Sequence, residues 1–461
     1  MDVWSKARVL IRTKNEWRRK ASDRRLVESL ARERETLLGD ASAGKGVLHA
    51  REPWWRGDLQ TVKGFLSNWV HLMLVAVPLG IIAGALKWSS VYVFCLNFLA
   101  LIPLALLLGD VTEDLALRYG SVIGGLINAT FGNIVEIILS IAALFHELYG
   151  VVAASLLGSI LSNLLLVTGC SFFFGGLYNK TQKFNPTGTQ ASSSLLFLAA
   201  LAFLIPTGAG LMFSPEKPDY DTDKMVLRIS RGTAVVLLLC YGCYLGFQLG
   251  THVDLFQDDA NNGSSGNGRH GGNGGSSGSS GGDCEITGGC GSSDLDAGEA
   301  YVSPHWNEPQ LSLTTSVLLL TAITLTVAVA SEYLTASLEQ FSKRSGLGEA
   351  FLGTIVLPIA GNACEHMTAV IVATKNKMDL SMGVAIGSSI QVALFAVPLA
   401  VVVGWISGHP FSLSFDPFSA MALMLSVAQV NFVTAGATSN WLLGVQLMVL
   451  FALLSLAYYF K

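Results

Sequence analysis

Two stretches of the chain place a carboxylate inside an apolar segment, and both follow the same pattern. Gly132 to Glu136 reads GNIVE, and Gly361 to Glu365 reads GNACE. An ionisable side chain at membrane depth costs about 3 kcal/mol or more on insertion scales, unless it has a partner or water. Two copies of so unfavourable a feature, far apart in the chain, predict one site that is built from two halves.

Polar residues recur around each Glu at helical spacing. Residues three or four positions apart lie on one face of a helix. The faces formed in this way contain Thr130, Asn133 and Glu136 in the first copy, and Asn362, Glu365 and His366 in the second. The apolar segments that follow the motifs add neutral oxygens from Ser159 and Asn163, and from Ser388 and Gln391. Glycines beside both motifs, with Pro358 in the second, permit kinks that free backbone carbonyls for a ligand.

This set of groups suits a hard cation. Ca²⁺ takes about 6–8 oxygen ligands in a tolerant geometry. The sequence has no thiolate set and no HExxH motif, which argues against a soft metal or a catalytic zinc. The predicted metal ligands are Glu136, Glu365, Asn133, Asn362, Ser159 and Ser388. Proton coupling or support of the ligands is predicted for His366, Thr130, Asn163, Gln391, Glu332 and Glu113.

Most of these residues also have a structural interpretation. The two asparagines would equally join helices by hydrogen bonds, and the two serines are small enough for close helix packing. His366 is either a proton relay or a hydrogen-bonded packing residue. Glu113 lies near the end of its apolar segment, whereas Glu332 lies near the centre of another. Each of these two is either a gating residue or an interfacial one.

The carboxylates predict how two ion flows are coupled. A buried Glu without a cation is expected to hold a proton. A divalent cation displaces that proton, so cation and protons compete for one site. We therefore expect an antiporter that works by alternating access, in which Glu136 and Glu365 bind Ca²⁺ or protons in turn. Mn²⁺ is the alternative cation, and no cofactor is expected.

The composition requires a membrane protein. Of 461 residues, 51% are hydrophobic and only 13% are charged, against about 25% charged in soluble domains. Apolar runs long enough to cross a bilayer recur along the chain. We predict eleven spans at about 65–87, 89–109, 120–144, 148–176, 191–213, 230–252, 311–337, 347–373, 381–406, 415–435 and 439–460.

The spans fall into two matching groups of five after a first extra one. Glu113-x-Leu115 resembles Glu332-x-Leu334, and Gly158-Ser159 matches Gly387-Ser388. The matches keep their order around the two Gly-Asn-x-x-Glu motifs. Because each group has an odd number of spans, the second must enter the membrane from the opposite side. This is the layout of an inverted-topology repeat, which is common in secondary transporters.

The predicted fold class is therefore an all-α polytopic membrane protein of about eleven transmembrane helices. Of 29 Lys and Arg residues, 14 precede residue 60, which predicts a cytosolic N-terminus. The expected parts are a cytosolic tail over 1–63, an extra transmembrane helix over 64–87, a first five-helix repeat over 88–256, a flexible Gly/Ser/Asn-rich linker over 257–310 and a second five-helix repeat over 311–461. The tail is either solvated or makes a regulatory contact with the transporter body.

Two stretches resemble a known family almost word for word. They are GGLINATFGNIVEI at Gly124–Ile137 and LPIAGNACEHMTAVIVATKNKMDLSMGVAIGSSIQVALFAVP at Leu357–Pro398. The chain is similar to the vacuolar-type cation/proton exchangers of the calcium/cation antiporter superfamily. The resemblance implies a core of ten spans plus one, and Ca²⁺ export from the cytosol into a vacuole or other acidic organelle, driven by protons. By motif position, the family's ion-binding acids fall on Glu136 and Glu365.

The chain departs from this family in three places. Ile134 stands where a small residue is usual, and Cys364 stands where Ala is usual. Family members often carry a strongly acidic segment between the halves, whereas this chain has a Gly/Ser/Asn linker with scattered acids. That difference puts cation capture by such a segment in doubt. The Ser- or Thr-rich, Pro-Glu/Asp motif of the sodium-coupled branch is absent, which favours protons.

Two other classes compete with the antiporter. A gated cation channel is the main alternative, and a sodium-coupled calcium exchanger is an alternative within the antiporters. A membrane-embedded hydrolase would need a nucleophile–base constellation near the acids, and none is visible, so no enzyme is expected. The expected partners are the lipid bilayer, a divalent cation and protons, without nucleic acid. The sequence sets neither the oligomeric state nor the stoichiometry.

Overall fold

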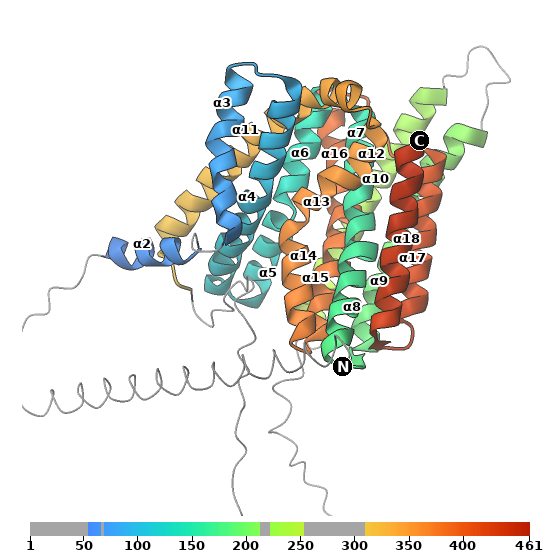
Figure 1. Ribbon diagram of the computed structural model, residues 1–461. Coiled ribbons are helices and arrows are strands. Elements are labelled where there is room, and N and C mark those ends of the chain that lie inside the picture. The colour runs from blue at the N-terminus through green and yellow to red at the C-terminus, as the bar shows by residue number, and fades with distance from the viewer. Residues whose placement is uncertain (1–53, 66–68, 213–221, 253–308) are drawn as a thin grey trace, which may run out of the picture. The chain divides into compact units, whose positions relative to one another are not determined.

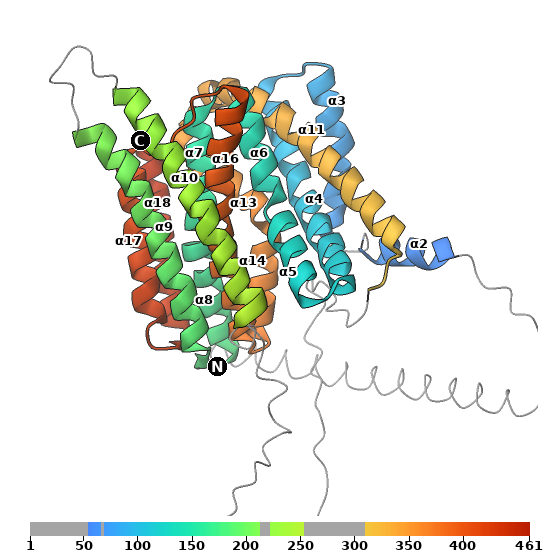
Figure 2. The same cartoon turned by 180° about the vertical axis from the view of Figure 1, so that it is seen from behind.

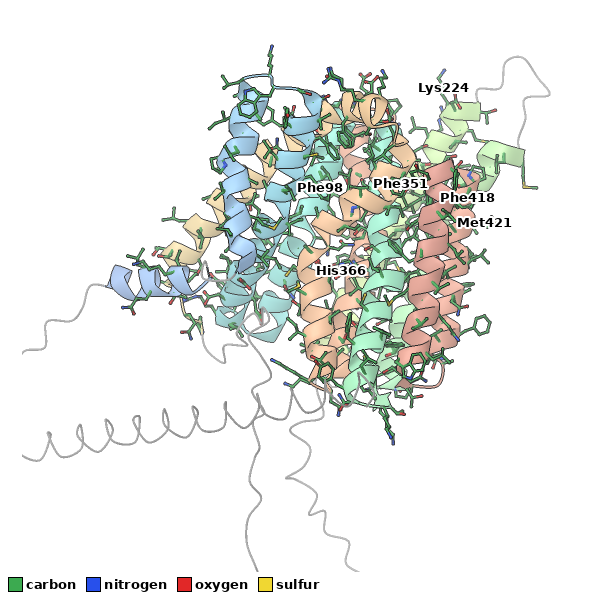
Figure 3. All side chains as sticks on the ribbon, viewed as in Figure 1. Phe98, Lys224, Phe351, His366, Phe418 and Met421 are labelled. Atoms are coloured by element: carbon green, nitrogen blue, oxygen red, sulfur yellow. The ribbon has the colours of Figure 1, made fainter. Side chains whose placement is uncertain are left out.

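A computed structural model describes residues 54–65, 69–212, 222–252 and 309–461. Most of the predicted tail (1–63) and of the predicted linker (257–310) therefore lies outside the described residues. The described part is a bundle of helices (Figure 1). Large apolar side chains such as Met421 remain exposed on outer helices (Figure 3), as a surface that faces lipid requires.

The helices of the first half begin before the predicted core. They are α2 (Trp54–Phe65), the 3₁₀ helix η1 (Trp69–Val75), α3 (Ala76–Ala85), α4 (Ser90–Arg118), α5 (Gly120–Phe131), α6 (Ile134–Phe145), α7 (Tyr149–Leu161), the π-helix η2 (Ser162–Val167), α8 (Thr168–Tyr178), α9 (Pro186–Met212), α10 (Thr222–Gly246) and the π-helix η3 (Phe247–Thr251). The predicted second span ends too early, because α4 continues through the acidic residues 110–114 to Arg118.

The second half contains a corresponding series. It consists of α11 (Leu313–Ser345), α12 (Glu349–Phe351), the π-helix η6 (Leu352–Val356), α13 (Leu357–Gly361), α14 (Ala363–Thr374), α15 (Met378–Gln391), the π-helix η7 (Val392–Ala396), α16 (Val397–Ser407), α17 (Pro417–Thr434) and α18 (Trp441–Phe460). Two short strands, β1 (Gln182–Lys183) and β2 (Thr438–Ser439), pair antiparallel and join loops of the two halves.

Helix length and composition account for most of the predicted spans. Among the described residues, eight helices are long and apolar enough to cross a bilayer. A ninth span is the pair formed by 349–361 and 363–374, which is bent by 59°. The first and third predicted spans coincide with the shorter apolar helices Leu72–Ala85 and Ile134–Phe145. The polytopic α-helical class is confirmed, and the total of eleven stays a prediction.

Both Gly-Asn-x-x-Glu motifs interrupt a helix. Asn133 has φ −110° and ψ 23° between α5 and α6. Asn362 has φ −86° and ψ 17° between α13 and α14. The predicted span over 120–144 therefore consists of two helices, and the prediction that Thr130 shares one helical face with Glu136 is wrong. Each Glu instead lies in the first turn of the helix that follows the break.

The two halves repeat one architecture in opposite directions. The breaks, the Gly-Ser pairs and the π-helices η2 and η7 recur with a nearly constant sequence separation. In Figure 1, α7 and α8 descend through the bundle, whereas α15 and α16 ascend. Figure 2 shows α7, α8 and α16 of these helices from behind. This arrangement confirms the inverted repeat that the odd number of spans predicts.

Helix α3 docks on the first helices of both repeats through two glycines one turn apart. A Cβ at Gly80 would lie 2.8 Å from Oδ1 of Asn97 on α4, and Asn97 Nδ2 donates to the Gly80 carbonyl at 3.2 Å. A Cβ at Gly84 would lie 2.4 Å from the Tyr333 ring on α11. The spacing matches the small-xxx-small contacts that allow membrane helices to approach closely.

The start of α11 is held by a buried carboxylate from the first repeat. Asp114 accepts hydrogen bonds from the backbone N–H groups of Gln310 at 2.6 Å and Leu311 at 3.2 Å, and from the Ser316 hydroxyl at 3.1 Å. Asp58 on α2 accepts in turn from the N–H of Ser312 at 2.9 Å. These bonds satisfy donors that the helix itself leaves unpaired.

Asp114→Ala is expected to destabilise the fold measurably. The change removes the acceptor of two backbone N–H groups, and a buried group left unsatisfied costs about 1–3 kcal/mol. Thermal unfolding of the purified protein in detergent would show a lower Tm. Glu349→Ala, at an exposed position, serves as the control. Equal Tm values for the two variants would contradict this role of Asp114.

Candidate cation site

The two motif carboxylates are buried at the starts of helices. Glu136 is 6% exposed in the first turn of α6, and Glu365 is 7% exposed in the first turn of α14. The N-terminus of a helix presents free N–H groups and the positive end of the helix dipole, which favours a nearby negative charge. Among the described residues, none donates a hydrogen bond to either oxygen of Glu136 or to Oε2 of Glu365.

The two motifs meet across a glycine. A Cβ at Gly361 would lie 2.8 Å from Oε1 and 3.3 Å from Cδ of Glu136. Gly361 belongs to the second motif and is four residues before Glu365. The structure therefore brings the two predicted halves of the site together.

The asparagines at the breaks bond to the opposite repeat. Asn133 donates through Nδ2 to Oε1 of Gln391 at 2.5 Å. Asn362 accepts a hydrogen bond from the Ser159 hydroxyl at 2.9 Å and donates to the Ser159 carbonyl at 3.2 Å. These bonds cross from one half to the other and position both breaks. The structure therefore contains the hydrogen bonds between helices that were predicted for both asparagines. Their role as ligands stays a prediction.

A cavity of about 420 Å³ reaches Glu365 from one end of the bundle. Its wall comes from both repeats, and its oxygen-bearing side chains include Asp110, Glu113, Asn133, Glu365, Asp379, Ser388 and Gln391. The wall also includes the start of α9 and the start of α15, which lie at the lower end in Figure 1. Carboxylate, amide and hydroxyl oxygens on one wall can coordinate a hard cation.

Glu136 lies outside this cavity. It lines a separate space of about 10 Å³ with Ser155, Pro358 and Gly361. That volume is about the smallest that holds one water molecule. Gly361 lines both spaces. The two carboxylates of one site therefore have different access, although their motifs are repeats.

Several predicted supporting residues are satisfied within their own helices. Ser388 donates to the Val384 carbonyl at 2.7 Å, and Thr130 donates to the Leu126 carbonyl at 2.8 Å. His366, labelled on α14 in Figure 3, has Nδ1 2.8 Å from the Asn362 carbonyl oxygen. Its Nε2 and both amide atoms of the fully buried Asn163 have no hydrogen-bond partner among the described residues.

Glu113 and Glu332 lie in different surroundings in the structure. Glu113 lines the large cavity. Glu332 instead pairs with Nε2 of His146 at 2.8 Å, and its side chain is 56% exposed. The position of Glu332 near the centre of its hydrophobic segment therefore does not place it in the cavity, because the helical face on which it lies is turned away.

Two features of the site do not follow from the sequence pattern. Asp110 lies three residues before Glu113 on α4 and lines the same cavity, which their helical spacing allows. Gly361 was treated as a source of kinks, whereas its missing side chain is what makes room for the Glu136 carboxylate. No sequence pattern distinguishes these two uses of a glycine.

Comparison with known proteins agrees with this architecture. The family described as "Sodium/calcium exchanger protein" matches residues 89–250 and 315–460. A vacuolar calcium ion transporter of Schizosaccharomyces pombe is 37% identical over 86% of this chain and 85% of its own length. A Ca²⁺/H⁺ antiporter of Synechocystis is 40% identical over 84% and 96%, respectively. The solved structure of native YfkE, at 30% identity, superposes with a TM-score of 0.65 over 85% of this chain and all of YfkE. The chain therefore belongs to the sodium/calcium exchanger protein family.

Proposed function

We propose that this protein is a secondary antiporter that exchanges cytosolic Ca²⁺ for protons across the vacuolar membrane. Its relatives include vacuolar calcium ion transporters and Ca²⁺/H⁺ antiporters, which are transporters rather than enzymes. The observation that carries the proposal is the contact of Glu136 with Gly361 of the second motif, where Glu365, but not Glu136, lines the large cavity.

The cation is proposed to enter through the cavity and to reach Glu365 first. Glu113 and Asp110 on the cavity wall contribute negative potential along this route. At the break, the cation would meet the carboxylates together with the oxygens of Asn133, Ser388 and neighbouring backbone carbonyls. Neutral side chains complete a shell of the size that Ca²⁺ prefers. Asn362 and Ser159 join this shell when their mutual hydrogen bonds open.

Proton coupling follows from competition at the same carboxylates. Two buried carboxylates that are close together cannot both remain charged without a compensating cation. Ca²⁺ supplies that compensation, and protons supply it after Ca²⁺ leaves. Occupancy by either ion would allow the breaks to reorient and expose the site on the other side. His366, with one buried nitrogen near this break, and Asn163 would assist proton transfer, and Gln391 and Thr130 would support the two breaks.

The cavity is proposed to open to the cytosol. Its mouth lies at the bundle end where α9 and α15 begin, and the basic tail before residue 60 is expected on the cytosolic side. Next to Gly361, away from this cavity, lies the small space at Glu136, of about 10 Å³. A cavity closed at the site supports alternating access over an open channel.

Transport in sealed vesicles tests this proposal. Purified protein in proteoliposomes should accumulate Ca²⁺ against its gradient when a pH difference, acidic inside, is the sole energy source. Collapse of the pH difference should stop the uptake, since a channel cannot concentrate an ion in this way. Mn²⁺ and Na⁺ are added in turn as competitors. Uptake that needs a Na⁺ gradient, or that persists without any gradient, would refute proton coupling.

A further inference from the structure

Helix α7 packs against the segment η6–α13 without room for a side chain. A Cβ at Gly158 would lie 2.2 Å from the Thr354 carbonyl oxygen and 2.7 Å from Cγ of Pro358. A Cβ at Gly353 would lie 2.7 Å from Cβ of Ala154. Real Cβ atoms essentially never come within 3.0 Å of another heavy atom. Backbone therefore meets backbone here, on the side of the site that the large cavity does not reach.

The corresponding positions of the other repeat, on α15 and α5, do not touch each other. The repeat partners of Ala154 and Gly158 on α15 are Gly383 and Gly387, at the same sequence separation that relates the two motifs. Neither glycine has a heavy atom within 4 Å of the place where its Cβ would be. Both line the large cavity, together with Gly125 on α5, which is the repeat partner of Thr354. The contact between α7 and η6–α13 is therefore closed, whereas the equivalent contact between α15 and α5 is open.

We propose that the α15 face at Gly383 and Gly387 closes onto α5 at Gly125 to seal the cavity. This proposal rests on the alternating access proposed above and names the residues that make the second seal. Gly387 would meet the Gly125 carbonyl as Gly158 now meets the Thr354 carbonyl. The contact between α7 and η6–α13 would separate at the same time. These glycines are positioning residues, because they control access without binding the cation.

Glycine is required at the second seal for a physical reason. Two helices that touch through their backbones leave no volume for a methyl group, and overpacking of such a contact is destabilising. In the open arrangement a methyl group at Gly387 meets nothing, so its effect falls on the closed state alone. The side chain of Leu249 on η3 now covers Gly125, with Cδ2 2.6 Å from the position of a Cβ there. Closure therefore also requires Leu249 to move aside.

Gly387→Ala is expected to slow exchange about tenfold or more while the purified protein still binds Ca²⁺ from the cavity side. The measurements are proteoliposome uptake and equilibrium binding of radioactive Ca²⁺. Gly208→Ala on α9 is the matched control, because this helical glycine also has nothing within 4 Å of its Cβ position and does not line the cavity. Gly387→Ala that transports at the rate of Gly208→Ala would overturn the proposal.

Cross-linking tests the closed contact without reference to the transported ion. In a chain with its native cysteines replaced, Asn128→Cys with Val384→Cys should form a disulfide on oxidation, because these residues line the cavity beside the seal and leave its glycines intact. Ser155→Cys with Leu357→Cys, at the repeat partners of Val384 and Asn128, is the control pair, since both residues already line one small space in the closed contact. Membranes in which only the control pair cross-links would refute the second seal, even if Ca²⁺/H⁺ exchange were fully confirmed. Cross-linking of both pairs, each in a separate fraction of molecules, would support it.

Discussion

Glu365→Gln is expected to reduce proton-driven Ca²⁺ uptake to the level of empty vesicles. Gln has the shape of Glu but carries no charge and does not exchange a proton, so both the cation ligand and the coupling group are lost. A singly charged site in this position would also leave Ca²⁺ short of compensating charge. Glu136→Gln is expected to have the same effect, because the two carboxylates act on one ion.

The measurement compares initial rates of Ca²⁺ uptake in proteoliposomes with equal amounts of folded protein. Glu339→Gln is the control, because Glu339 is exposed on α11 and pairs only with Lys343 in the described structure. Surface pairs of this kind contribute little to stability, so the control should transport normally. Full uptake by Glu365→Gln would remove this residue from the proposed mechanism.

Gly361→Ala is expected to lower exchange about tenfold or more, although it changes no charged group. The new methyl carbon would lie 2.8 Å from Oε1, 3.3 Å from Cδ and 3.5 Å from Cγ of Glu136. The carboxylate must therefore move out of the place where the two motifs meet. Overpacking of a tight contact costs about 1–3 kcal/mol, so the Tm should fall as well.

A shorter carboxylate side chain at position 136 tests whether the new methyl group acts through Glu136. Glu136→Asp removes one methylene group and should restore part of the space when combined with Gly361→Ala. The double variant is therefore expected to have a higher Tm than Gly361→Ala alone, which a double-mutant cycle measures. Gly232→Ala on α10, where a Cβ meets nothing within 4 Å, is the matched control. Additive effects in the cycle would show that the methyl group does not act through Glu136.

The sequence predicts that the two motifs form one site, because the repeat can be recognised from the residues alone. Glu136 and Glu365 occur in matching contexts, and inverted repeats place matching elements about a common axis. The sequence does not predict which glutamate faces the cavity. The two motifs are nearly equivalent in pattern, whereas in the proposed exchange cycle their access depends on the separation of α5 and α15. Such asymmetry is a property of the conformation and not of the motif.

The predictions for Glu332 and Thr130 were wrong because the surroundings of a helical face depend on how the helices pack. Glu332 and Glu113 occur in the same Glu-x-Leu pattern, yet Glu332 pairs with His146 at an exposed site and Glu113 lines the cavity. Periodicity shows which residues share a face but not what that face contacts. Thr130 and Glu136 lie on separate helices because Asn133 has left the helical conformation, and the Asn133 side chain bonds to Gln391 of the other repeat.

Gly361 also lies where most of the membrane potential is expected to fall. The residue lines the large cavity on one side and the small space at Glu136 on the other. An aqueous cavity conducts ions, so the electric potential falls mainly across the protein that closes it, and one elementary charge that crosses 100 mV gains about 2.3 kcal/mol. A displacement of the break by a few ångströms would then move the bound ions through much of the potential. Because Ca²⁺ or two protons neutralise the two carboxylates, the loaded site carries no net charge in either direction. The reorientation step should therefore depend little on voltage, although it crosses most of the potential.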